Sequence, residues 1–209
     1  YLLAKKTLSV NAINKIISGI DEEKKLAYDV KHIEKLYLEF QANYIDDKKS
    51  VAALKEKYGS GEVLLLGPGG SISQKQQEIQ AYIDNCNPQI IAVNFIPEGF
   101  DIDGIFIGSS KRYGTLVYQL EHIKAGTDII ITSNIDNIEH IAEYVLNIER
   151  LLDEREAIKD ISTAMVLNLL IELKVNSISL AGFDGFGDYE RNLYCDECTP
   201  LNTAHSDGE

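Results

Sequence analysis

The stretch Glu62-Val63-Leu64-Leu65-Leu66-Gly67-Pro68-Gly69-Gly70-Ser71 joins a short apolar run to a glycine-rich turn. A polar, helix-forming stretch follows it. The order of strand, glycine turn and helix is typical of the first unit of a Rossmann-like sheet. Glycines let a ligand approach the backbone, and N–H groups at the start of a helix attract anions. The stretch therefore predicts either a phosphate-binding loop or a turn that is rich in glycine for close packing.

Apolar runs of strand length recur along the chain. They cover residues 62 to 66, 89 to 94, 104 to 108, 128 to 132 and 177 to 181, and helical patterns at 73 to 85, 112 to 124 and 159 to 174 lie between most of them. Residues 138 to 152 fit either a helix or a strand over 144 to 148, and we favour the strand. This alternation predicts an α/β fold with a Rossmann-like, mostly parallel sheet covered by helices.

The residues before the sheet have a helical pattern. From Ser9 to about Tyr58, apolar side chains recur at spacings of three and four, and Asp46-Asp47 is a candidate cap for a helix that carries Val51 and Leu54. We predict a helical segment over 1–60 and a Rossmann-like domain over 61–209, with a flexible acidic tail from about residue 185. Because the chain opens on tyrosine and not methionine, we expect it to be a piece of a longer polypeptide.

Composition narrows the class of protein. The chain has 209 residues, 44% of them hydrophobic, which is enough for a sizeable core. Its formal net charge of -13 disfavours nucleic acid and anionic membranes as partners. No apolar run approaches the roughly 18 residues that span a bilayer, and the start lacks a signal-peptide pattern. Together with only three cysteines, this predicts a cytoplasmic protein.

Two of the cysteines have a spacing that occurs in metal sites. Cys195 and Cys198 have the two-residue separation of half a zinc site, but His205 is the only further candidate ligand nearby. Because tetrahedral zinc needs four ligands, we expect no metal site here.

Small, polar or charged residues follow the expected strands. In a parallel sheet, ligands bind outside the carboxyl ends of the strands, so these positions form a candidate site for phosphate, ribose and base edges. The candidate ligand-binding residues are Gly67, Gly69, Gly70, Ser71, Asn94, Ser109, Ser110, Lys111, Arg112, Ser133, Asn134, Gly182 and Asp184.

Each of these residues also has a purely structural interpretation. Asn94 and Asn134 suit tight turns as well as ligand contacts. Ser110 is a candidate helix cap, and Lys111-Arg112 either contacts phosphate or is solvated. Asp184 caps the next turn, or binds a ribose hydroxyl or a metal, and capping is the commonest role for such a residue.

The segments Lys5-Lys6-Thr7-Leu8-Ser9-Val10-Asn11-Ala12-Ile13-Asn14 and Leu36-Tyr37-Leu38-Glu39-Phe40-Gln41-Ala42-Asn43 add a family resemblance. They resemble the helices after the barrel in bacterial aldolases of the 4-hydroxy-2-oxovalerate aldolase and HMG-CoA lyase-like family. The rest of the chain resembles the extra C-terminal domain that some of these proteins carry. In that family, a TIM barrel that uses a divalent metal performs the aldol chemistry, and its catalytic motifs do not occur here. The resemblance implies an accessory domain of a lyase.

A second resemblance covers the sheet domain. The order of Gly67-Pro68-Gly69-Gly70-Ser71, Asn94, Ser162-Thr163-Ala164-Met165 and Ile178-Ser179-Leu180-Ala181-Gly182-Phe183-Asp184 is similar to that of motifs in bacterial sialyltransferases that bind CMP-sugars. Related glycine-rich loops occur in pterin diphosphokinase-like domains. The similarity implies that Gly67, Gly69 and Ser71 face phosphate, that Asn94 meets the nucleotide, and that Ser162 and Thr163 lie across the cleft. Pro68 replaces the family's asparagine, Ala164 stands where a glycine is typical, and no residue matches the catalytic histidine.

Three functions are compatible with these residues. We favour an accessory domain that binds a nucleotide, nucleotide-sugar or other phosphorylated small molecule at the glycine-rich loop. The second is a sugar-nucleotide-dependent glycosyltransferase, in which this loop and Lys111-Arg112 stabilise the phosphate leaving group. The third is an interaction domain whose N-terminal helices dock the aldolase barrel or a partner subunit.

Overall fold

The computed structural model describes residues 35, 38, 45–137, 140–155, 158, 159 and 161–184. Most of the predicted N-terminal helical segment, the pair Cys195 and Cys198 and the predicted tail from residue 185 lie outside the described residues. Among the residues described, no helix has the length and apolar composition needed to cross a bilayer.

The described part of the chain forms a parallel sheet of six strands in the order β5-β4-β3-β2-β1-β6. The α/β fold class is thus confirmed, and so is the strand expected within residues 138 to 152. Each of the other predicted runs also forms a strand. The strands are β1 (Glu62–Leu66), β2 (Gln89–Val93), β3 (Gly104–Ile107), β4 (Asp128–Thr132), β5 (Tyr144–Leu146) and β6 (Ser177–Ala181).

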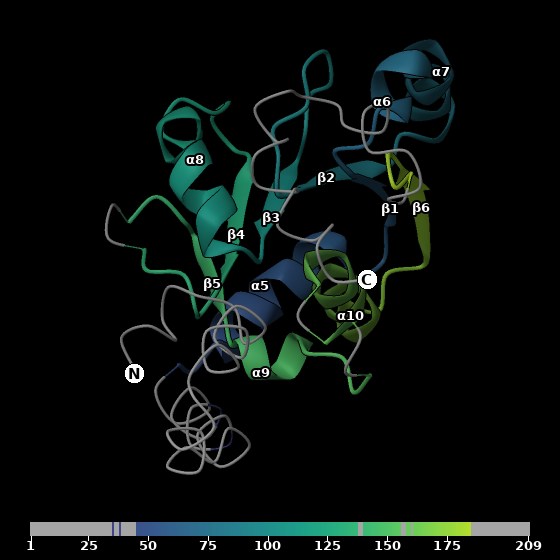
Figure 1. The fold of residues 1–209 in the computed structure, drawn as a ribbon. Coiled ribbons are helices and arrows are strands. Elements are labelled where there is room, and N and C mark those ends of the chain that lie inside the picture. Colours follow the sequence, from purple (N-terminus) through teal and green to yellow (C-terminus); the bar gives the residue numbers. More distant parts are fainter. Residues whose placement is uncertain are drawn as a thin grey trace.

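Helices cover both faces of this sheet (Figure 1). We call the face covered by α5, α9 and α10 the α10 face and the opposite one, covered by α6, α7 and α8, the α8 face. The helices are α5 (Lys48–Tyr58), α6 (Ser71–Gln74), α7 (Gln76–Cys86), α8 (Ser110–Leu120), α9 (Ile148–Leu151) and α10 (Ser162–Leu173). The stretch predicted as one helix over 73 to 85 is therefore α6 and α7, because the backbone leaves the helical conformation at Lys75.

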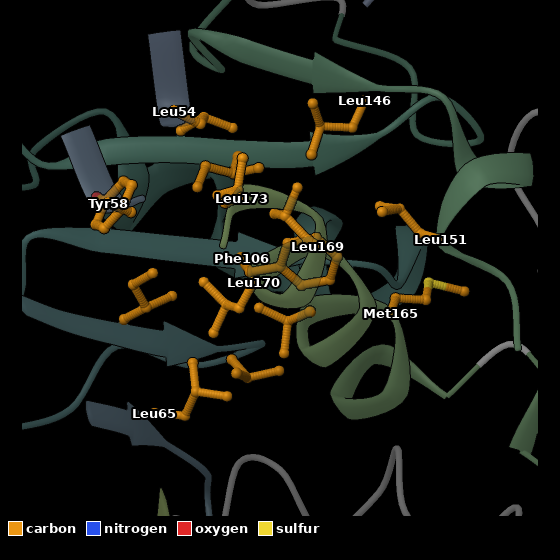
Figure 2. Close-up of a cluster of buried hydrophobic side chains, with 14 of the residues drawn as sticks. Leu54, Tyr58, Leu65, Phe106, Leu146, Leu151, Met165, Leu169, Leu170 and Leu173 are labelled. Carbon is orange, nitrogen blue, oxygen red and sulfur yellow. The ribbon is translucent and has the colours of Figure 1, made fainter. Parts of the chain in front are cut away.

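Alternate residues of the strands point to opposite faces and build two cores. On the α10 face, Leu54 and Tyr58 of α5 are fully buried against strands and α10, so this helix belongs to the core of the sheet domain (Figure 2). On the α8 face, α6, α7 and α8 cover Leu64, Leu66, Ile105 and neighbouring side chains. Both faces of the sheet are buried at β1 to β4, which explains why these strands are rich in apolar residues.

The chain changes direction across the sheet at β1. Strands β2 to β5 are added on one side of β1, and β6 returns to the other side. Since crossovers between parallel strands are right-handed, the helices before β6 fall on the face opposite to α7 and α8. The carboxyl ends of β1 and β6 therefore flank a topological switch point, where open α/β sheets commonly bind ligands.

Candidate functional site at the carboxyl edge of the sheet

The glycine-rich loop after β1 packs against the turn after β6. Gly67 N donates to Ala181 O at 2.8 Å, and Gly69 N donates to Gly182 O at 2.8 Å. A Cβ at Gly67 would lie 2.6 Å from Gly182 O, and one at Gly69 would lie 2.5 Å from the same atom. The two loops thus touch through their backbones, and this contact requires glycine.

A carboxylate of the chain occupies the start of α6. Asp184 Oδ2 accepts a hydrogen bond from Ser71 N at 2.7 Å, and the Ser71 hydroxyl donates to the same carboxylate. Asp184 therefore binds the first residue of α6. Its expected role of capping the turn that follows it falls on residues outside the described part of the chain. Because an anion already accepts the Ser71 N–H, a phosphate at this position would have to displace Asp184.

Asn94 joins the ends of β2 and β3. Its backbone is left-handed, with a φ of 62°, and its N–H donates to Phe106 O at 2.9 Å. Its side-chain Oδ1 accepts a hydrogen bond from Gly108 N at 3.2 Å. Asparagine tolerates this backbone conformation better than most residues, so Asn94 serves the turn, and its amide lies at the edge where a ligand is expected.

Helix α8 begins at this edge, directly after β3. Ser109, with an extended backbone, is its N-cap, and its Oγ accepts from Arg112 N at 3.5 Å. The expectation that Ser110 caps this helix is wrong, because the helix begins at Ser110 itself. Ser110, Lys111 and Arg112 form the first turn, and Lys111 is exposed.

Helix α10 begins against the end of β3. A Cβ on Gly108 would lie 2.7 Å from Ser162 Oγ and 3.3 Å from Met165 Sδ, so a larger residue would force these side chains of the helix to move. Ile161 occupies the N-cap position of α10, and among the described residues no side chain caps this helix. The structure thus brings Ser162, with Thr163 next to it, to the strand ends.

The end of β4 supplies a group of buried polar side chains. Ser133 Oγ accepts a hydrogen bond from Ile148 N at 3.1 Å, and Thr132 Oγ1 donates to Asn134 Oδ1 at 2.5 Å. Asn134 is only 2% exposed, and its Nδ2 has no hydrogen-bond partner among the described residues. A buried amide nitrogen without a partner is rare, since most buried polar groups are paired.

The predicted site residues thus fall into two groups at one edge of the sheet. The first lies at β1 and β6 and contains Gly67, Gly69, Gly70, Ser71, Gly182 and Asp184. The second lies at β2, β3 and β4 and contains Asn94, Ser109, Ser110, Lys111, Arg112, Ser133, Asn134, Ser162 and Thr163. Sequence reasoning missed Thr132 and Gly108, although Gly108 stands at the end of an apolar run, where a close approach is plausible.

Comparison of the chain with protein-family models and with curated proteins finds no match.

Proposed function

We propose that this chain is an accessory domain, attached to an aldolase-like protein, that binds a nucleotide or another phosphorylated small molecule at the carboxyl edge of β2, β3 and β4. The observation that carries the proposal is that α8 and α10 begin on either side of Gly108. The family resemblance of the N-terminal segment supports the accessory role.

Two helix N-termini at the carboxyl end of β3, one on each face of the sheet, favour an anionic ligand. The first N–H groups of a helix have no partner within the helix, and the macrodipole adds partial positive charge at that end. Lys111 adds a full positive charge in the first turn of α8. In a chain of net charge -13, this local arrangement is the best place for a phosphate among the groups of the edge.

The residues at the ends of β1 and β6 suit the hydroxyl groups of the ligand better than its phosphate. Asp184 already supplies a negative charge beside Ser71, which disfavours phosphate there. A carboxylate accepts up to about four hydrogen bonds, so exposed Asp184 has the capacity to accept ligand hydroxyl groups as well. A molecule with a phosphate at one end and sugar hydroxyls at the other matches both groups.

The proposal predicts that a nucleotide raises the melting temperature of the chain. Thermal shifts are measured with CMP, CMP-sugars, UDP-sugars, ATP and inorganic phosphate. At about 100 times the Kd, binding stabilises the native state by about 2.7 kcal/mol, a shift of several degrees for a domain of this size. In the variant Lys111→Glu, the shift should shrink because a negative charge then faces the anion.

Lys55→Glu is the matched control. Lys55 is exposed on α5 near the opposite edge of the sheet, and the substitution makes the same change in net charge. The control should keep the full shift. Equal shifts in both variants would place the ligand elsewhere, and no shift with any compound would contradict the binding function and favour the interaction domain.

A further inference from the structure

The buried amide of Asn134 lies beside the start of α10. Strands β3 and β4 pair in parallel with Ile107 opposite Ile131, so the next residues, Gly108 and Thr132, stand level with each other. One strand spacing, about 4.8 Å, separates them. The Asn134 amide is hydrogen-bonded to Thr132 Oγ1, and Ser162 Oγ abuts Gly108. Asn134 and the N-terminus of α10 are thus neighbours along the same edge.

The two groups also lie on the same face of the sheet. Thr132 pairs with Leu146, which belongs to the core of the α10 face, and it follows Ile130 of that core by two positions. Gly108 follows Phe106 of the same core by two positions, and Met165 of α10 lies against it. The Thr132 side chain, with the Asn134 amide bonded to it, therefore points to the face that holds the first turn of α10.

From this placement we propose that Asn134 Nδ2 and the N–H groups of Ser162 and Thr163 bind the phosphoryl group of the ligand. This assignment rests on the proposed function and locates its anion. The buried amide supplies a donor, and hydrogen bonds from fixed donors to a phosphate oxygen are short and strong. Thr132 is a positioning residue, because its hydroxyl holds the amide oxygen and leaves Nδ2 for the ligand.

The assignment differs from the expectation that the glycine-rich loop holds the phosphate. At that loop, the Ser71 N–H is bonded to Asp184, whereas Asn134 Nδ2 has no partner among the described residues. A donor that is already bonded to a carboxylate must lose that bond before it binds phosphate, whereas a donor without a partner loses nothing. The two locations are therefore separable by substitution.

The test is binding of inorganic phosphate and CMP to the full chain by calorimetric titration. Asn134→Asp replaces the NH₂ donor with an oxygen of the same shape and should weaken binding about tenfold or more. Ser71→Ala, at the glycine-rich loop, should change it less than about twofold. Asn87→Asp is the matched control, because Asn87 is exposed at the end of α7, on the opposite edge, and the charge change is identical.

A second measurement does not depend on a variant that folds. In ¹H–¹⁵N spectra of the native chain, phosphate should shift the Asn134 side-chain amide and the Ser162 and Thr163 backbone amides more than the Ser71 amide. Loss of binding in Ser71→Ala with retention in Asn134→Asp would overturn this assignment and leave the proposed function standing. Absence of binding for both compounds and all other nucleotides would instead overturn the proposed function itself.

Discussion

Replacing Gly182 with alanine is expected to lower the free energy of unfolding by about 4 kcal/mol. Gly182 has a φ of 77°, where a residue with a Cβ is strained. The new Cβ would also run into the backbone carbonyl of Gly67 and lie 2.5 Å from Ile72 Cγ1. Since the carbonyl belongs to the backbone of the glycine-rich loop, it cannot turn away, and the loops after β1 and β6 must separate.

The variant Gly126→Ala separates the cost of the backbone conformation from the cost of the steric clash. Gly126 also has a positive φ, 92°, but no atom lies within 4 Å of its Cβ position. This control should lose only about 1 kcal/mol, the cost of the backbone conformation. Urea unfolding followed by circular dichroism measures both variants. Similar losses for Gly182→Ala and Gly126→Ala would show that the close contact between the two loops does not exist in solution.

Most of the fold could be predicted from the sequence because strands β1 to β4 are buried on both faces of the sheet. Continuous apolar runs such as 129 to 131 then mark strands directly, and the stretches between them must cross over as helices. Strand β5 was harder to predict because it has only three residues, Tyr144–Leu146, and two of these are partly exposed. The break between α6 and α7 at Lys75 could not be predicted, because neither proline nor glycine occurs there.

The site was less predictable because its contacts join residues far apart in sequence. The ends of the predicted strands were enough to place Gly67 to Ser71 and Asp184 at the carboxyl edge of the sheet. No local sequence pattern, however, predicts that β6 pairs with β1. Because β6 lies beside β1, the Asp184 carboxylate accepts a hydrogen bond from Ser71, 113 residues away. The backbone donor that was predicted to bind phosphate is therefore already paired. The contact of Gly108 with Ser162 has the same origin, since α10 reaches β3 only through the reversed crossover.

The opposite edge of the sheet holds a buried acid and phenol. Tyr58 Oη, at the end of α5, donates to Asp128 Oδ2 at 2.6 Å, and Lys57 Nζ lies 2.8 Å from Asp128 Oδ1. Asp128 is 4% exposed, so these partners replace the hydrogen bonds that its carboxylate would otherwise make to water. The three side chains fasten α5 to the first residue of β4.

Tyr58→Phe is expected to lower the free energy of unfolding by about 3 kcal/mol at neutral pH. The substitution keeps the ring in the core and removes the one hydroxyl that donates to Asp128 Oδ2. A buried charged acceptor is then left with Lys57 as its side-chain partner. Tyr118→Phe is the matched control, because Tyr118 is 71% exposed, and it should change stability by less than about 0.5 kcal/mol.

The hydrogen-bonded pair of Tyr58 and Asp128 also predicts that the stability of the chain falls at alkaline pH. Burial raises the pKa of the Tyr58 hydroxyl well above its usual range, and the hydrogen bond to Asp128 and the negative charges of Asp128 and Asp103 raise it further. In the unfolded chain, a tyrosine loses its proton near pH 10. The contribution of this group is therefore complete below about pH 10 and is lost above it, at about 1.4 kcal/mol for each pH unit.

Urea unfolding of the native chain, Tyr58→Phe and Tyr118→Phe between pH 8 and about pH 11 measures this slope. The stability gap between the native chain and Tyr58→Phe should narrow above about pH 10, since phenylalanine has no proton to lose. The native chain and Tyr118→Phe should fall in parallel, because both keep the Tyr58 hydroxyl. A gap for Tyr58→Phe that stays constant to pH 11 would mean that the Tyr58 hydroxyl is not held in the buried bond to Asp128.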